Sequence, residues 1–266
     1  MIPLAAITAW SNTFPWVNPH FVEQDLVLCR VLVELFNDDL IASKIAFRGG
    51  TAIHKLHHSI QPRYSEDIDL VQLKPEPIGE VLNRIRMILS YLGSPNVKQA
   101  QHNNTVIYRF ISESLPHTKL RIKIEINCKE HSNILGLVTF PFEVRNPWFT
   151  GNCAVITYSM DELIGSKIRA LYQRKKGRDL FDIHYAHKND YLDISNVLYC
   201  YRVFMQQSIG YVPSAEQYLE NLTRKLRDSA FRADMDPLIH PNIEYNVYEA
   251  YEEFCKYYIE AMEAVV

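Results

Sequence analysis

The sequence predicts an α+β protein, with a mixed β-sheet flanked by helices in residues 1–157 and a helical C-terminal part in residues 158–266. Two observations lead to this fold class. Segments that alternate polar and apolar residues, as half-buried strands do, gather between residues 44 and 158. After residue 158, apolar residues recur at helical spacing instead. With 266 residues and 47% apolar content, the chain can bury a core for one large domain or two modest ones.

The first part of the chain predicts both helices and strands. Apolar residues at helical spacing predict a helix over 21–36, and the polar cluster Asn37 to Asp39 ends it. A strand over 44–47 leads through two glycines into a helix over 51–58. Further predicted segments are a strand over 67–71, a helix over 78–92, and strands over 105–111, 120–127, 138–144 and 154–158.

The second part predicts helices alone. Ser159 and Glu162 have the spacing of a capping box, which is typical of a helix start. Further helices are predicted over 179–188, 193–208, 214–230 and 245–264. We therefore place the boundary between the two parts near residue 157.

Composition excludes some functions and leaves others open. A net charge of −3 gives no general attraction to nucleic acid, so binding to it would need a local basic patch. No segment reaches roughly eighteen uninterrupted apolar residues, and the start lacks the basic region of a signal peptide, so we expect no membrane span. The five cysteines form no CxxC pair, which is typical of reduced thiols, and we expect a cytoplasmic protein.

A glycine pair lies where the first predicted strand meets its helix. Gly49 and Gly50 let the backbone approach a phosphate closely, the helix presents its N-terminal amides, and Thr51 adds a hydroxyl. Alone, such a pair is more often an ordinary strand-to-helix turn. It becomes a candidate nucleotide site through the acidic residues that follow.

Asp67 and Asp69 alternate with apolar residues, so both should project from the same face of one strand. Carboxylates so placed can share two magnesium ions, which clamp the attacking and leaving oxygens in phosphoryl transfer from an NTP. A solvated strand face is the simpler alternative, although acids are poor strand formers. Glu125 supplies a third acid if its strand lies next to the first; otherwise Lys123 would simply pair with a neighbouring charge.

Four blocks of sequence follow one another in a distinctive order. They are Phe47–Lys55, Arg63–Leu70, Asp161–Ala170 and Arg174–Ile183. In residue types and order they resemble the AbiEii/AbiGii-type nucleotidyltransferase toxins of bacterial toxin–antitoxin and phage-defence pairs. The resemblance implies a DNA-polymerase-β-like nucleotidyltransferase fold, transfer of NMP from an NTP to a cellular acceptor, and a cognate antitoxin protein as partner.

Carried over by position, the resemblance implies a role for each matching residue. The triphosphate would be held by Gly49, Gly50, Thr51 and Ser65, the magnesium by Asp67, Asp69 and Glu125, and the outer phosphates by Lys167. Asp182, or else Asp179, would orient or deprotonate the acceptor.

Simpler interpretations of the later blocks remain open. A helical lysine such as Lys167 is usually a solvated surface residue. Asp179 and Asp182 also suit a plain charge role near a helix N-terminus. The basic run from Arg174 to Arg178 predicts a local phosphate-binding or RNA-binding patch, or only a solvated loop. The histidines of residues 54–58 have a spacing that could bind zinc, but no acidic or cysteine ligand accompanies them.

The acceptor follows less directly from the sequence. We expect RNA, in particular the 3′ end of a tRNA, and protein is the rival acceptor. The alternative from another functional class is a nucleotide-binding regulatory protein without turnover. Its need for paired acids would be hard to explain, which favours the enzyme.

Overall fold

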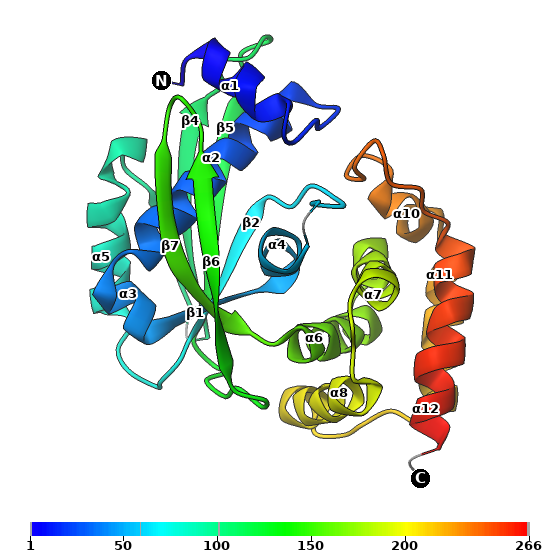
Figure 1. The fold of residues 1–266 in the computed structure, drawn as a ribbon. Coiled ribbons are helices and arrows are strands. Elements are labelled where there is room, and N and C mark those ends of the chain that lie inside the picture. The colour runs from blue at the N-terminus through cyan, green and yellow to red at the C-terminus, as the bar shows by residue number, and fades with distance from the viewer. Residues whose placement is uncertain (1, 59, 101, 265–266) are drawn as a thin grey trace. The chain divides into compact units, whose positions relative to one another are not determined.

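The computed structural model describes residues 2–58, 60–100 and 102–264, and these form two compact units (Figure 1). The first unit ends at Tyr158 and contains the β-sheet, whereas the second begins at Ser159 and is helical. The predicted α+β class is confirmed. None of the helices in the described ranges is long and apolar enough to cross a membrane.

Seven strands of the described chain form one mixed sheet. They are β1 (Ile45–Arg48), β2 (Asp67–Gln72), β3 (Asn96–Gln99), β4 (Asn103–Ile111), β5 (Lys119–Asn127), β6 (Leu137–Arg145) and β7 (Thr150–Tyr158). Their order across the sheet is β3-β4-β5-β2-β1-β7-β6. The pairs β2–β5 and β1–β7 are parallel, and the remaining neighbours are antiparallel. This order places the short strands β1 and β2, which carry the predicted site, at the centre of the sheet.

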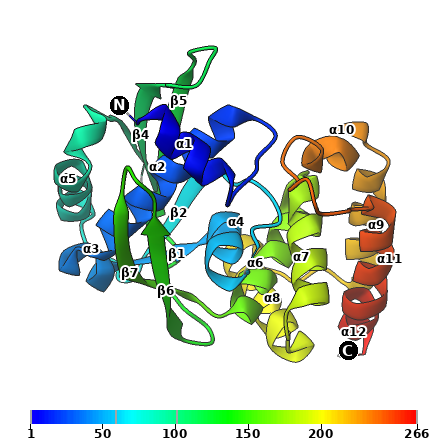
Figure 2. The same ribbon diagram turned by 45° about the horizontal axis from the view of Figure 1, so that its top comes forward.

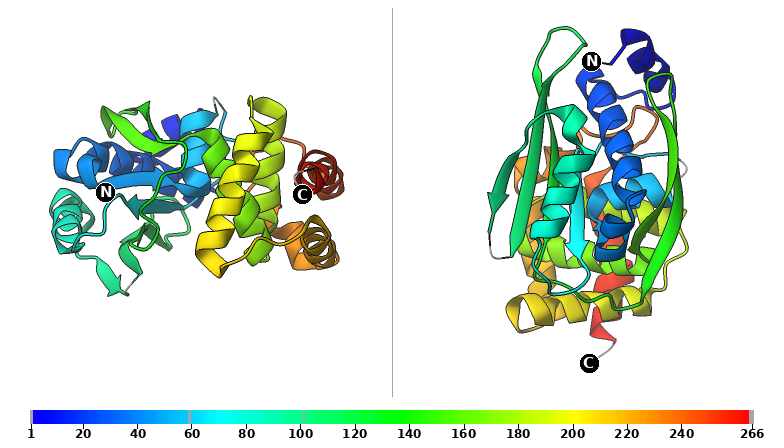
Figure 3. Two further views of the ribbon diagram at one scale, coloured as in Figure 1. Left: turned by 90° about the horizontal axis from the view of Figure 1, so that it is seen from below. Right: turned by 90° about the vertical axis from the view of Figure 1, so that its left-hand side faces the viewer.

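Helices of the first unit cover the sheet and complete its core. They are α1 (Leu4–Ser11), α2 (Pro19–Phe36), α3 (Asp39–Lys44), α4 (Gly49–Ala52), η1 (Ile53–His57), α5 (Gly79–Ile88) and η2 (Ser90–Leu92). The long helix α2 packs against β5, β6 and β7, and α5 lies beside it (Figure 3). Leu26, Leu28 and Leu32 of α2 are fully buried, each contributing roughly 1.5–3 kcal/mol of hydrophobic stabilisation.

Three elements of this unit were missed by the sequence analysis, namely α1, α3 and β3. The polar cluster after residue 36 does end α2, but it also starts α3, because the Asp38 side chain accepts a hydrogen bond from Ile41 N at 3.1 Å. A capping residue has the same composition as a loop residue, so the short helix behind it was hidden. Strand β3 is almost fully exposed and carries little apolar pattern.

The second unit is built from packed helices. They are α6 (Met160–Gln173), α7 (Gly177–Asn189), α8 (Ile194–Ile209), α9 (Ala215–Leu226), α10 (Ser229–Arg232), η3 (Ala233–Met235), α11 (Val247–Phe254), η4 (Cys255–Ile259) and α12 (Glu260–Glu263). Helix α7 lies between α6 and α11 (Figure 2). Ser159 caps α6 as its spacing predicts. The helix predicted over 214–230 is instead broken after Leu226, because Asp228 caps a separate short helix.

Candidate functional site

The turn between β1 and α4 brings the backbone against the acidic strand β2. Gly49 has a φ of +81°, a left-handed conformation that L side chains rarely adopt. A Cβ atom at this position would lie 2.3 Å from Oδ2 of Asp69. This approach follows from the antiparallel pairing of β1 with β2, which sets Arg48 opposite Asp69. Both the backbone conformation and the neighbouring carboxylate therefore restrict position 49 to glycine.

Thr51 fastens the start of α4 to the acidic strand. Its buried hydroxyl donates to the carbonyl oxygen of Asp67 at 2.6 Å, so Ser65 Oγ must be the donor in their 2.7 Å contact. Each hydroxyl proton is thus used within the unit, and the two side chains position Asp67. Direct contact of Thr51 and Ser65 with a triphosphate stays a prediction, and it would require these hydroxyls to turn.

Asp67, Asp69, Lys123 and Glu125 form a charged row on two neighbouring strands. In the parallel pair β2–β5, Asp67 lies opposite Lys123 and Asp69 opposite Glu125. Because alternate residues of a strand share a face, all four side chains lie on one face of the sheet. Nζ of Lys123 lies 3.3 Å from Asp67 Oδ2 and 3.1 Å from Glu125 Oε2. The predicted neighbourhood of the two strands is observed, and so is the pairing of Lys123 with adjacent charges.

Asp67 and Asp69 fit a divalent cation. Oδ1 of Asp67 is buried and has no hydrogen-bond partner in the described ranges, and a cation would satisfy it. Within those ranges no group of three or more His, Cys, Asp or Glu side chains is arranged to hold a metal ion. Glu125 does not complete such a group because the ammonium of Lys123 lies between its carboxylate and that of Asp67. Glu125 can act as a third ligand only if Lys123 moves.

The segment after the glycine turn is held by buried contacts that the sequence analysis did not single out. Lys55 Nζ donates to Asp25 Oδ1 at 2.7 Å and to Cys29 Sγ at 3.1 Å, and the Lys55 and Asp25 side chains are buried. An acid inside the apolar helix α2 was the available signal. The ring centroids of His57 and Phe140 lie 4.4 Å apart, and burial lowers the pKa of His57 to about 4. His57 is therefore a packing residue in this structure.

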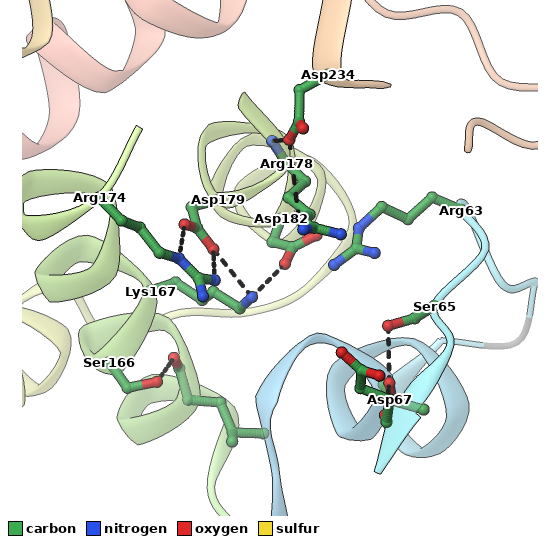
Figure 4. A network of polar contacts seen from close by, with 12 residues as sticks. Arg63, Ser65, Asp67, Ser166, Lys167, Arg174, Arg178, Asp179, Asp182 and Asp234 are labelled. Carbon is green, nitrogen blue, oxygen red and sulfur yellow. Dashed lines mark hydrogen bonds and ion pairs between the residues drawn. The ribbon is translucent and has the colours of Figure 1, made fainter. Parts of the chain in front are cut away.

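Lys167 of α6 is enclosed by two carboxylates of α7 (Figure 4). Its Nζ lies 3.2 Å from Asp179 Oδ1 and 2.7 Å from Asp182 Oδ2. The Lys167 side chain is only 5% exposed, and those of both acids are 0% exposed. The alternative of a solvated surface lysine is wrong. Asp179 does lie in the first turn of α7, as the alternative of a plain charge role near a helix N-terminus requires, but both acids are buried against Lys167.

Asp179 and Asp182 differ in their further partners. Arg174 donates two hydrogen bonds of 2.7 Å to Asp179, one to each carboxylate oxygen. Burial by itself would raise the pKa of Asp179, but the charges of Lys167 and Arg174 outweigh it and hold that pKa below its ordinary value. Asp179 is therefore a poor proton acceptor, which leaves Asp182 as the better candidate for the acid on the acceptor side.

The basic run from Arg174 to Arg178 is paired with acids of its own unit. Lys175 Nζ lies 2.5 Å from Asp228, whereas Lys176 and Arg178 lie 3.9 and 3.8 Å from Asp234. The side chains of Lys175, Lys176 and Arg178 are 53%, 47% and 33% exposed, so these pairs contribute little stability and can be exchanged for phosphate contacts. Arg174 differs because its partner is completely buried.

Comparison with known proteins identifies the family of this chain and relatives of its fold. Residues 30–255 match the family model described as nucleotidyl transferase AbiEii toxin, type IV toxin–antitoxin system. The fold is similar to that of the nucleotidyltransferase toxin MenT4 from Mycobacterium tuberculosis, at 14% identity and a TM-score of 0.52, over 98% of this chain and 96% of that one.

A proposed nucleotidyltransferase from H. pylori has the same identity of 14% and TM-score of 0.52, over 94% of this chain and 99% of that one. These likenesses concern the fold. A comparison with curated proteins gives no match. Since the family model spans most of its length, the chain belongs to the AbiEii family of nucleotidyltransferase toxins.

Proposed function

We propose that this chain transfers NMP from an NTP to RNA, in particular to the 3′ end of a tRNA, with magnesium bound by Asp67 and Asp69. One observation carries the proposal. The buried Asp67 Oδ1, without a partner among the described residues, lies one alternation away from Asp69, which closely approaches the Gly49 turn. Burial of a carboxylate oxygen without a partner costs free energy, and a bound cation would remove that cost.

The side chains of the first unit would bind the nucleotide. Magnesium, when bound, supplies a Lewis acid and charge neutralisation for phosphoryl transfer. Asp67 and Asp69 would hold it, with Glu125 as the third acid once Lys123 leaves. The backbone of Gly49 and Gly50 would receive the triphosphate, and Thr51 and Ser65 would keep Asp67 in place.

In the helical unit, Lys167 and Asp182 carry the remaining proposed roles. The Lys167 ammonium would bind the outer phosphates, and Asp182 would orient or deprotonate the acceptor. Their mutual ion pair of 2.7 Å gives each buried side chain a partner of opposite charge. If the Lys167 ammonium binds a phosphate instead of Asp182, the Asp182 carboxylate could accept a proton.

Asparagine variants test the metal assignment. Asp67→Asn and Asp69→Asn each keep the side-chain volume but remove the charge, so transfer of labelled NMP should fall roughly 10³-fold. Asp39→Asn, which neutralises an exposed acid of the same unit, is the matched control and should leave transfer unchanged. If the folded Asp67 and Asp69 variants keep transfer within about tenfold of the wild type, the assignment is wrong.

Lys175, Lys176 and the partly exposed Arg178 support RNA as the acceptor, because the chain as a whole carries a net charge of −3 and needs a local basic patch to attract RNA. Replacing all three by glutamine should flatten the salt dependence of RNA labelling by up to about three units of slope, one per lost phosphate contact. NTP binding should be almost unchanged. Arg174 is not replaced, because its loss would remove one of the two cations that pair with the buried Asp179 carboxylate. RNA labelling with an unaltered salt dependence contradicts the patch, and label found only in protein contradicts RNA.

Membership of a toxin family implies an antitoxin partner, and we propose that the pair acts in phage defence. A cytoplasmic location is supported by the use of NTP and by the free state of all five cysteines. The rival regulatory function without turnover makes a distinct prediction. It requires NTP binding that depends on magnesium together with no labelled product on either RNA or protein.

A further inference from the structure

Lys123 occupies the central position of the acidic row. Its Nζ is within 3.3 Å of Asp67 Oδ2 and within 3.1 Å of Glu125 Oε2, and its side chain is 23% exposed. It comes from the same strand as Glu125 and lies opposite Asp67 in the parallel register. The ammonium therefore lies between two of the three carboxylates proposed as metal ligands.

The neighbouring bases are paired away from this position. Arg48 contacts Glu130 at 2.6 Å, and Arg121 contacts Glu66 at 3.4 Å. Lys123 thus provides the ammonium that two members of the row share. An ammonium and a magnesium ion compete for the same carboxylate oxygens, and two cations only a few ångströms apart repel each other strongly in a half-buried place.

We infer that Lys123 is a resident counter-cation of the metal site, which holds Asp67 and Glu125 together and must be displaced before these two acids can share a divalent ion. The inference rests on the proposed function, since it takes Asp67 and Glu125 as metal ligands. Two consequences follow. Metal binding without nucleotide is weakened by Lys123, and a triphosphate relieves the weakening because it offers the displaced ammonium another anion.

The test measures Mn²⁺ binding from the signal that free aqueous Mn²⁺ gives in electron paramagnetic resonance, with no turnover required. Lys123→Met keeps most of the side-chain length but removes the charge, and it should bind Mn²⁺ roughly tenfold more tightly than the wild type. In the presence of a non-hydrolysable NTP analogue the gain should shrink. Lys123→Arg, which keeps the charge, should remain within about threefold of the wild type.

Lys119→Met is the matched control. Lys119 is an exposed residue of the same strand and face, four residues away, or about 13 Å along an extended strand. That distance exceeds the screening length of about 10 Å at 0.1 M salt, so its removal should change Mn²⁺ affinity less than twofold. If Lys123→Met is poorly folded, Lys123→Gln serves in its place, and Mn²⁺ should raise its melting temperature more than that of the wild type.

The outcomes separate the two proposals. Equal Mn²⁺ affinity of the wild type and both neutral variants overturns the role of Lys123 while leaving the metal site intact. A tightening of the same size in Lys119→Met also overturns it, because the effect would then be one of net charge. If Asp67→Asn binds Mn²⁺ as well as the wild type does, the metal lies elsewhere and the proposed function itself fails.

Discussion

Replacing Gly49 with alanine should damage transfer much more than it damages the fold. The new Cβ would lie 2.3 Å from Oδ2 and 3.0 Å from Cγ of Asp69, and real Cβ atoms are essentially never closer than 3.0 Å to another heavy atom. The carboxylate must therefore withdraw by about 1 Å. If Asp69 binds the metal as proposed, a displacement of this size should cost roughly 10²-fold in rate.

The loss of stability in the same variant has a separate cause. Alanine at a φ of +81° costs about 1–2 kcal/mol relative to glycine, which a domain with an ordinary stability of 5–15 kcal/mol survives. Gly136 offers a matched control in the same unit. Its φ is +90°, and a Cβ there would meet nothing within 4 Å. Gly136→Ala should therefore lose similar stability without losing transfer.

The assay compares labelled NMP transfer by Gly49→Ala, Gly136→Ala and wild type, with urea unfolding as the measure of stability. The specific effect is the ratio of the two variants' rates, expected near 100 in favour of Gly136→Ala. Equal rates at equal stability loss would refute the reasoning, because the contact with Asp69 would then have no bearing on catalysis. Stability unchanged in both variants would refute the conformational part.

Three further changes probe other parts of the chain. Lys167→Ala should lower the free energy of unfolding by about 3 kcal/mol in urea titrations, since two completely buried carboxylates lose their shared cation, whereas Lys167→Arg should recover part of that loss. Burial lowers the pKa of His57 to about 4, so as pH falls the unfolded chain binds a proton on this residue before the folded chain does. The free energy of unfolding of the wild type should therefore fall by about 2–3 kcal/mol as pH drops from 6.5 to 4, and His57→Phe should show a flatter pH profile. Lys225 donates hydrogen bonds to the carbonyl oxygens of Leu171 and Tyr172 at the end of α6. Lys225→Met should therefore lower the free energy of unfolding by about 1–2 kcal/mol in thermal unfolding, and an unchanged melting temperature would mean that these hydrogen bonds do not stabilise the fold.

Much of the fold follows from local pattern. Helix α2 and the strands β2, β4 and β5 lie within a few residues of their predicted bounds, because long amphipathic runs leave one arrangement that buries their apolar face. Elements without such a pattern were missed, as the exposed strand β3 shows. The divided helix after Leu226 shows the same limit, since one aspartate changed from a surface residue into a cap.

In the candidate site, too, some residues could be predicted from the sequence and others could not. Asp67, Asp69 and the glycine turn could be singled out from residue types and spacing, because catalysis of this kind needs unusual residues in a strand. The role of Lys123 could not, because its contact with Asp67 depends on the register between β2 and β5. Spacing along one strand does not specify that register.

By itself, the sequence determined the α+β class, the family and the acidic pair, since each is written in the order of residues along the chain. The tertiary structure alone decided which charges are already paired. Lys167 is buried between two carboxylates, and Lys123 bridges two others. The physical reason is that the energy of a charge depends on its neighbours in space and on its distance from water, and both arise only when remote segments pack together.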